Sequence, residues 1–187
     1  MIFSLLSHVV NGVKGGVKAG LEGVTDVGTT IVGVVKDTTV KVLKETSEFV
    51  EKGVEATASV VKGSIEGVAD IGESVVGMIS GIVRGAIRGA TEAGASQKQV
   101  VRGAVAQTIH SAAELGLDVG EVAVEAVKGS VQAVTTIGGD AIEGTKEAVL
   151  AAIEAAGDIS EEVVSGVKDA LSSSIEGAKD IIEAAEE

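Results

Sequence analysis

The sequence predicts an all-α protein of long helices that carry an eleven-residue (hendecad) repeat and fold as a helical hairpin or an elongated bundle. Two observations lead to this prediction: apolar side chains recur every eleven residues along most of the chain, and the period of two that marks an amphipathic strand is absent. Eleven residues in three turns is about 3.67 residues per turn, so the apolar stripe drifts slowly in a right-handed sense. We therefore expect right-handed coiled-coil packing.

Internal similarity supports the repeat, because residues 21–33 match residues 65–77 at an offset of 44. One apolar column, with interruptions at Lys98 and Gly120, contains Val10, Leu21, Val32, Leu43, Val54, Ile65, Val76, Ile87, Ile109, Val131, Ile142, Ile153, Val164 and Ile175. A second column, five residues earlier, alternates alanine with leucine or isoleucine in the second half of the chain as far as Ile181. A third column, from Asp26 to Asp180, is acidic in most repeats, and its simplest interpretation is a solvated face.

Glycine is frequent, with 26 residues, although each costs a free helix about 1 kcal/mol relative to alanine. Many of the glycines lie in register with the repeat at a spacing of four, which allows two helix backbones to approach closely. The alternative is that glycine makes the helix conditional on a partner or a membrane. The predicted helix-packing residues are Gly12, Gly16, Gly77, Gly81, Gly85, Gly89, Gly166, Leu21, Ile65, Ile87, Val131 and Ile175.

A turn is predicted at residues 94–99, where Gly94 suits a left-handed cap and Ser96 with Gln99 matches a capping box. This turn divides a single repeat domain into a first helical arm, residues 1–93, and a second helical arm, residues 100–187. A second turn signal at residues 138–140, with a further bend near Gly53, would instead give a four-helix bundle. An uninterrupted rod is the third possibility, since the register does not shift across the turn.

The residues that could carry chemistry do not form a catalytic or metal-binding motif. The chain has no cysteine, and His110 has one acidic partner at helical spacing, Glu114, whereas a zinc site needs three or four ligands. The net charge of −13 argues against nucleic acid as a partner, because binding phosphates requires a basic surface. We expect no enzyme activity, no cofactor, no metal and no small-molecule substrate.

Charge is distributed unevenly between the two halves of the chain. Residues 1–93 carry 9 basic and 11 acidic side chains, and residues 94–187 carry 6 and 17. The basic residues around the predicted turn are Arg84, Arg88, Lys98 and Arg102. They are candidates for contact with anionic lipid headgroups or with an acidic partner, such as the second half of a neighbouring copy. The alternative interpretation is the solvated end of a hairpin.

Residues 21–42, with the phrases Glu-Gly-Val and Val-Gly-Thr-Thr-Ile-Val-Gly-Val-Val, resemble the synuclein-type eleven-residue repeat. The chain is also similar to late-embryogenesis-abundant, perilipin-like and phasin-like proteins. This resemblance implies a helix that lies on membranes or lipid inclusions. The glycine and alanine columns are more similar to hendecad coiled coils, which are right-handed bundles with small core residues.

We therefore expect a structural protein that assembles with itself into a coiled-coil homo-oligomer or filament, because a long apolar stripe is seldom left exposed on a soluble monomer. The alternative is an amphipathic-helix protein that reversibly coats a membrane or lipid-inclusion surface, with Phe3, Leu5 and Leu6 entering first. No stretch approaches the ~20 apolar residues that cross a bilayer as a helix. We expect a cytoplasmic location, with membrane association under the alternative.

Overall fold

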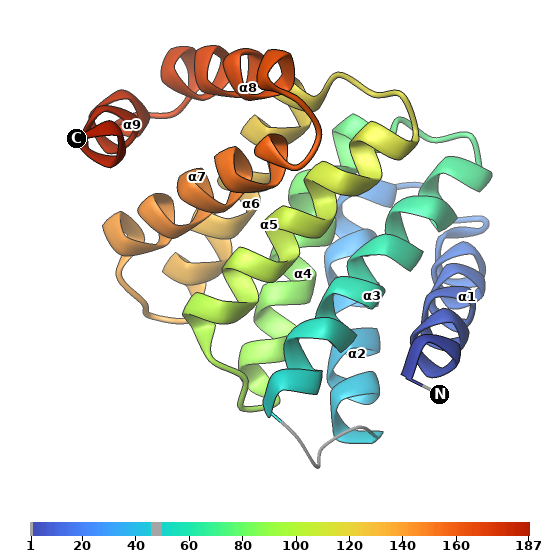
Figure 1. Ribbon diagram of the computed structural model, residues 1–187. Helices are drawn as coiled ribbons and strands as arrows, with labels where there is room; N and C mark the ends of the chain where they lie inside the picture. The colour runs from blue at the N-terminus through green and yellow to red at the C-terminus, as the bar shows by residue number, and fades with distance from the viewer. Residues whose placement is uncertain (1, 46–49) are drawn as a thin grey trace.

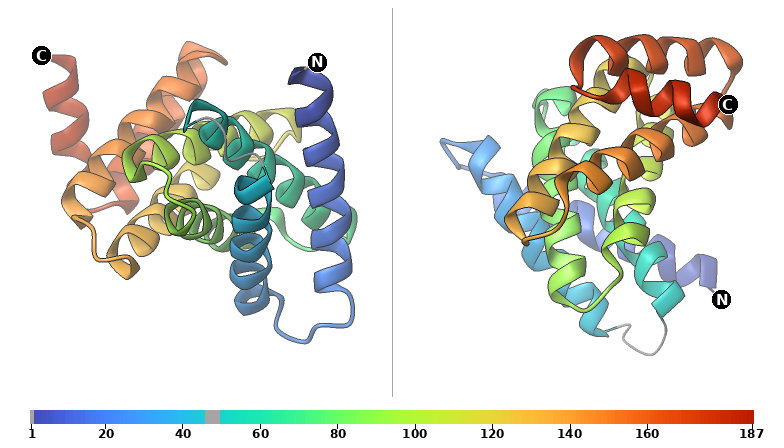
Figure 2. Two further views of the ribbon diagram at one scale, coloured as in Figure 1. Left: turned by 90° about the horizontal axis from the view of Figure 1, so that it is seen from below. Right: turned by 90° about the vertical axis from the view of Figure 1, so that its left-hand side faces the viewer.

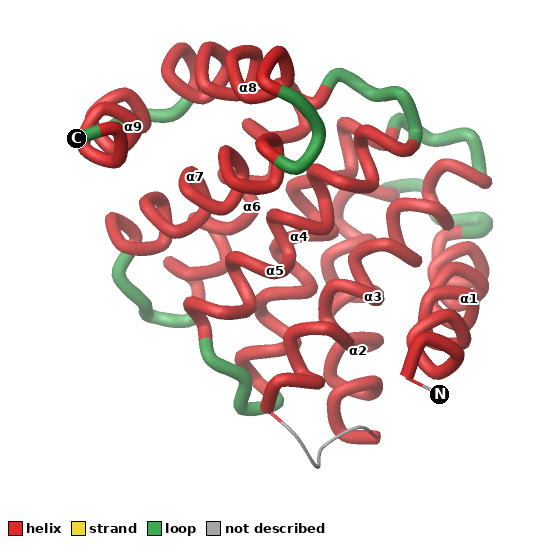
Figure 3. The backbone as a smooth tube through the Cα atoms, in the orientation of Figure 1, coloured by secondary structure: helices red, strands yellow, loops and turns green. Residues whose placement is uncertain are grey.

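The computed structural model describes residues 2–45 and 50–187, and this part of the chain contains helices and turns but no strand (Figure 3). The helices of the described residues are α1 (Ile2–Leu21), α2 (Val27–Glu45), α3 (Val50–Asp70), α4 (Val75–Glu92), α5 (Gln97–Glu114), α6 (Val119–Thr136), α7 (Ala141–Gly157), α8 (Glu161–Ser174) and α9 (Ala178–Glu186). The prediction of an all-α fold is confirmed.

The helices form two layers that extend from one end of the molecule to the other. In one layer α1, α3, α5 and α7 lie side by side, and in the other α2 packs on α4, α4 on α6, and α6 on α8 (Figure 1). The two termini lie at opposite ends of this array (Figure 1; Figure 2, left). Within the described residues each helix packs on helices one or two positions away in the chain, which is the arrangement of a helical repeat array, or α-solenoid.

The long arms expected for residues 1–93 and 100–187 are each divided into shorter helices. The first contains α1 to α4 and the second most of α5 through α9, and α3, with 21 residues, is the longest helix described. Both predicted turn regions separate helices: α5 begins at Gln97, after the turn at Gly94, and α7 begins at Ala141. Gly53 lies inside α3, so the bend is not at that residue; residues 46–49, between α2 and α3, lie outside the described residues.

Glycine ends four consecutive helices, α3 to α6, at a spacing of 22 residues. Gly72, Gly94, Gly116 and Gly138 have φ angles of 77, 96, 69 and 80°, a left-handed conformation that favours glycine. At Gly94 the N–H of the glycine donates to the Thr91 carbonyl and the N–H of Ala95 donates to the Ala90 carbonyl, which together form a Schellman motif. In this central part of the chain each structural unit is therefore one helix and one turn, and it contains two eleven-residue repeats.

A serine or aspartate stands two residues after each of these glycines, at the N-cap of the next helix: Ser74, Ser96, Asp118 and Asp140. The side chain of Asp140 accepts hydrogen bonds from the N–H groups of Ile142 and Glu143. Ser96 makes no such side-chain hydrogen bond, so the capping box predicted for Ser96 and Gln99 is wrong. The helix boundary at Ser96 depends instead on the glycine turn before it.

Because a unit contains two repeats, successive residues of the main apolar column lie in two different environments. Alternate members are buried: Leu21, Leu43, Ile65, Ile87 and Ile109. Members between them, such as Val32, Val54 and Val76, are only half-buried. The second column behaves similarly, because Ala104 and Ala126 are buried within helices while Leu115 and Ile137 are C-cap residues.

Glycine also sets how closely helices two apart in the chain approach one another. A Cβ atom on Gly85 of α4 would lie 2.6 Å from the carbonyl oxygen of Val32 on α2, and one on Gly89 would lie 2.5 Å from that of Lys36. Gly63 of α3 has the same relation to α1, where its Cβ would lie 2.6 Å from the Val10 carbonyl oxygen. These distances leave no room for any side chain, so the helix backbones meet directly.

We expect Gly89→Ala to lower the free energy of unfolding by about 1–3 kcal/mol, because the added methyl group overpacks the contact with Lys36. The matched control is Gly33→Ala in α2, where a Cβ meets nothing within 4 Å. This control should raise stability by up to about 1 kcal/mol, because alanine favours helix over glycine. Urea denaturation followed by circular dichroism measures both changes, and equal effects would contradict the close approach.

Candidate functional site

Within each of the two layers, ion pairs join neighbouring helices, which are two positions apart in the chain. Three of them are Lys14–Asp70 (3.2 Å, α1 to α3), Lys36–Glu92 (3.1 Å, α2 to α4) and Lys62–Glu114 (3.8 Å, α3 to α5). Their carboxylates belong to the acidic column, so these members bind neighbouring helices in addition to facing solvent. His110, considered on the sequence as a partner of Glu114, has its Nε2 atom 3.2 Å from Oδ2 of Asp158, the residue that follows the end of α7.

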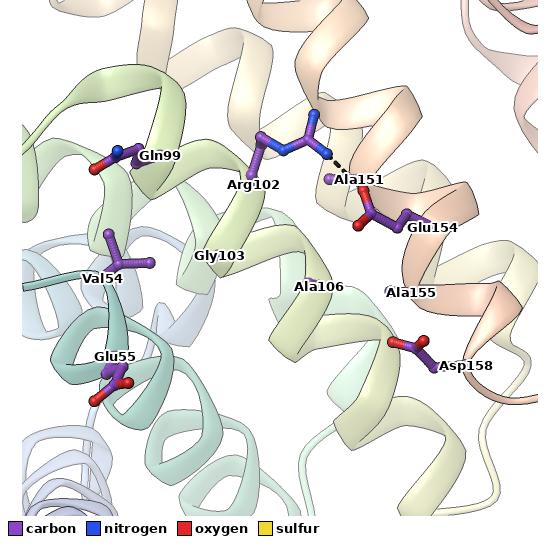
Figure 4. A pocket seen from close by; sticks show the side chains of 10 residues that line it. All are labelled: Val54, Glu55, Gln99, Arg102, Gly103, Ala106, Ala151, Glu154, Ala155 and Asp158. Carbon is purple, nitrogen blue, oxygen red and sulfur yellow. Dashed lines mark hydrogen bonds and ion pairs between the residues drawn. The ribbon is translucent and has the colours of Figure 1, made fainter. Parts of the chain in front are cut away.

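Further ion pairs lie beside a groove of about 500 Å³ between α3, α5 and α7 (Figure 4). Arg102 extends from α5 toward Glu154 on α7, and its Nη2 atom donates to Oε2 of that residue at 2.5 Å. The other terminal nitrogen of Arg102, Nη1, lies 2.9 Å from Oε2 of Glu147. Lys98 Nζ lies 3.2 Å from Oε1 of the same carboxylate. Both oxygens of Glu147 therefore bind a cation from α5.

Glu147 is only 5% exposed, so the expectation of a solvated face is wrong for this member of the acidic column. Burial of the carboxyl by itself raises its pKa, but the hydrogen bonds and charges of Arg102 and Lys98 more than offset this and hold the pKa below its ordinary value of 4.5. The arrangement stabilises the ionised carboxylate. It acts as a structural link between α5 and α7.

We expect Glu147→Gln to lower the free energy of unfolding at neutral pH by about 1–3 kcal/mol, because two charge-assisted hydrogen bonds are weakened in a buried place. A carboxyl whose pKa is depressed in the folded state contributes stability above its unfolded pKa and loses it as pH falls through the folded value. The difference between wild type and variant should therefore shrink below pH 4.5. Chemical denaturation at several pH values measures it, and a difference that stays constant with pH would contradict this role.

The four basic residues around the turn at Gly94, which the sequence suggested as one contact surface, form two separate pairs in the structure. Lys98 and Arg102 bind acids of α7, as described above. Arg84 and Arg88 instead line a groove between α4 and α2. The turn at Gly94 separates the two pairs.

The predicted helix-packing residues also occupy different places. Gly81, Gly85 and Gly89 lie against α2, and Leu21, Ile65 and Ile87 are buried in the core. An added Cβ on Gly77 would meet only its own N-cap residue Ser74. Of the glycines predicted to pack, three have nothing within 4 Å of an added Cβ: Gly12, Gly16 and Gly166. Val131 and Ile175 are half-buried beside an open groove.

At the N-terminal end, α1 exposes a face that the corresponding helix α3 buries. The repeat relates α1 to α3 at an offset of 44 residues, as it relates Leu21 to Ile65. In α3 the buried residues include Ala56, Ser59, Val60 and Gly63. The residues 44 positions earlier in α1 are Gly12, Gly15, Gly16 and Ala19, and all four are exposed, as is Asn11 beside them. We call these five residues the bare face of α1.

At the other end, an apolar groove of about 730 Å³ lies between α6, α7 and the junction of α8 with α9. Ile142, which is 82% exposed, lines this groove together with the half-buried side chains of Val131, Ile175 and Ile181. We call it the Ile142 groove. The exposed residues of α8 and α9 outside it are mainly serine, aspartate and glutamate, so the rest of this end is polar.

No helix in the described part of the chain combines the length and the apolar character that a membrane crossing needs. Among residues 2–45 and 50–187, no three histidine, aspartate or glutamate side chains are grouped so that they could hold a metal ion. Comparison of the chain with protein-family models gave no match, and a search of curated proteins also found no similar protein.

Proposed function

We propose that this is a non-enzymatic structural protein that assembles with copies of itself, head to tail, through the bare face of α1 and the Ile142 groove. The observation that supports this most strongly is the bare face, because the positions in α3 that the repeat relates to Gly12, Gly15, Gly16 and Ala19 are buried. A repeat array in water normally ends in a unit with a polar outer face. The bare face consists of one asparagine, three glycines and an alanine, and carries no charge.

Small residues are suited to receive another helix. Within the chain, Gly63 and Gly67 of α3 allow α1 to approach at backbone distance. Gly12, Gly15 and Gly16 offer the same kind of surface on α1, with nothing within 4 Å of an added Cβ. A helix from a second copy could therefore approach as closely as α3 does on the other side of α1. Right-handed coiled-coil packing between the hendecad helices of neighbouring copies is part of this proposal.

The C-terminal end of another copy is the partner that charge favours. Residues 94–187 carry 6 basic and 17 acidic side chains, a net charge of −11, whereas residues 1–93 carry 9 and 11, a net charge of −2. Pairing two C-terminal halves would bring two strongly negative surfaces together, whereas pairing one with an N-terminal half makes this repulsion much weaker. The Ile142 groove also offers one exposed large apolar side chain, that of Ile142, which an interface would cover. Head-to-tail contacts produce a ring or a filament.

The second candidate function is reversible coating of a lipid surface by α1. It rests on the apolar start of the chain, although the side chains of Phe3, Leu5 and Leu6 lie outside the described residues. Circular dichroism and light-scattering mass, measured with and without vesicles, separate the two functions. We expect full helicity and a multimeric mass without lipid. Helicity that develops only when vesicles are added would favour the lipid-coating function.

Two variants test the proposed interface: Gly16→Glu on the bare face and Ile142→Glu in the groove. Both residues are exposed, so the fold should be retained, while a carboxylate in an apolar contact should prevent association. We expect each variant alone to be monomeric by light scattering. Because Gly16→Glu keeps an intact groove and Ile142→Glu keeps an intact α1, an equal mixture should form dimers with one copy of each.

Gly157→Glu is the matched control, because this exposed glycine at the end of α7 has nothing within 4 Å and belongs to neither surface. It should assemble as the wild type does. If Ile142→Glu alone keeps its multimeric mass, the Ile142 groove is not the partner surface. If wild type is monomeric at all concentrations, self-assembly itself is wrong.

A further inference from the structure

Arg84 and Arg88 make no ion pair with any acid among the described residues, although the chain contains 28 acidic side chains. They lie four residues apart on α4, and therefore on one side of that helix. Both line a groove of about 470 Å³ between α4 and α2, which are neighbours in one layer (Figure 1). Arg102, by contrast, binds both Glu147 and Glu154. Two arginines without an acid are unexpected in a chain of net charge −13.

The Nε–H group of Arg84 has a further unmet requirement. The Nε atom is buried and has no hydrogen-bond partner within the described part of the chain. Buried polar groups in folded proteins are nearly always paired, because burial removes the water that would otherwise bind them. This atom is covered by protein atoms, so a ligand in the groove would bind the terminal nitrogens of the guanidinium group instead. A ligand with several oxygens could bind the terminal nitrogens of Arg84 and Arg88 together, since neither forms an ion pair with an acid of the described residues.

The opposite wall of the groove suits a small anion. Lys36 of α2 also lines it and supplies a third cation, although its Nζ lies 3.1 Å from Oε2 of Glu92. Gly28 and Gly33 have no side chains to fill the groove. The N-terminus of α2 beside Gly28 is already capped by the Asp26 carboxylate, which accepts a hydrogen bond from the Thr29 N–H at 3.2 Å. Asp37 is the one carboxylate among the lining residues, and it forms no ion pair within 4.0 Å with either arginine.

We propose that this groove binds a phosphate-type oxyanion through the guanidinium groups of Arg84 and Arg88, with Lys36 on the facing helix. Guanidinium groups match the geometry of phosphate oxygens and bind them through paired hydrogen bonds. The anion is either a soluble phosphate or the phosphate of a lipid headgroup, since both present the same oxygens. Because the groove uses neither the bare face of α1 nor the Ile142 groove, this site is independent of self-assembly.

The chain has three arginines, so their Nε–H signals can be followed separately by ¹H–¹⁵N nuclear magnetic resonance. We expect inorganic phosphate to shift the Arg84 and Arg88 signals. The Arg102 signal should not change, because Glu147 and Glu154 already bind its guanidinium group. A second experiment measures how much protein sediments with phosphatidylcholine vesicles that either contain or lack phosphatidic acid. A response to phosphate identifies a soluble anion, whereas a response confined to phosphatidic acid identifies a headgroup.

Variants test whether these residues form the site. Arg84→Gln and Arg88→Gln should each weaken binding about tenfold or more, because a charge-assisted hydrogen bond is lost. Asp37→Asn should strengthen binding, because it removes the negative charge that faces the ligand. Lys146→Gln, an equal change of charge on α7, is the control and should bind as wild type does, with circular dichroism showing that every variant is folded.

Loss of binding in the two arginine variants together with a gain in Asp37→Asn would establish the site. The proposal would be overturned by binding that the arginine variants retain. It would also be overturned if neither inorganic phosphate nor phosphatidic acid produced a response in the wild type.

Discussion

Alternate helices of this protein approach until the backbone of one touches a glycine of the next, as Val32 and Lys36 touch Gly85 and Gly89. The composition follows from this geometry: a layer of closely spaced helices has little room for large rings, and the sequence has two phenylalanines and no tryptophan or tyrosine. Each glycine within a helix weakens that helix by about 0.5–1 kcal/mol relative to alanine. The helices therefore depend on their neighbours, and the array is stabilised chiefly by contacts between adjacent units.

Dependence on neighbours makes the two ends of the array special. α1 has a helix of its own layer on one side only, and the face that would receive another is formed by Gly12, Gly15, Gly16 and other small residues. Lys14–Asp70 and similar ion pairs are partly exposed, so each contributes at most about 1 kcal/mol and serves mainly to favour one register between helices. Glu147 differs because it is buried between two cations. The apolar and small-residue contacts thus carry most of the stability, and an additional copy would extend the same kind of contact.

The helical class, the eleven-residue period and the close approach at part of the glycines could be predicted from the sequence. The positions of most turns were missed because a unit of 22 residues contains two whole repeats, so a turn does not shift the apolar column. A signal was nevertheless present. Alanine alternates with leucine or isoleucine in the second column, and a glycine is followed two residues later by serine or aspartate at Gly94, Gly116 and Gly138. The burial of Glu147 could not be predicted, because it depends on the pairing of α5 with α7.

The division of the four basic residues shows why sequence proximity misled the site prediction. In a two-armed hairpin, Arg84, Arg88, Lys98 and Arg102 would gather at one end of the molecule. In the array, the turn at Gly94 places α4 and α5 in different layers, so each pair meets the helix two positions away in its own layer. α7 presents Glu147 and Glu154 to the pair on α5. α2 presents glycines, Lys36 and Asp37 to the pair on α4, and neither of these arginines forms an ion pair with an acid of the described residues.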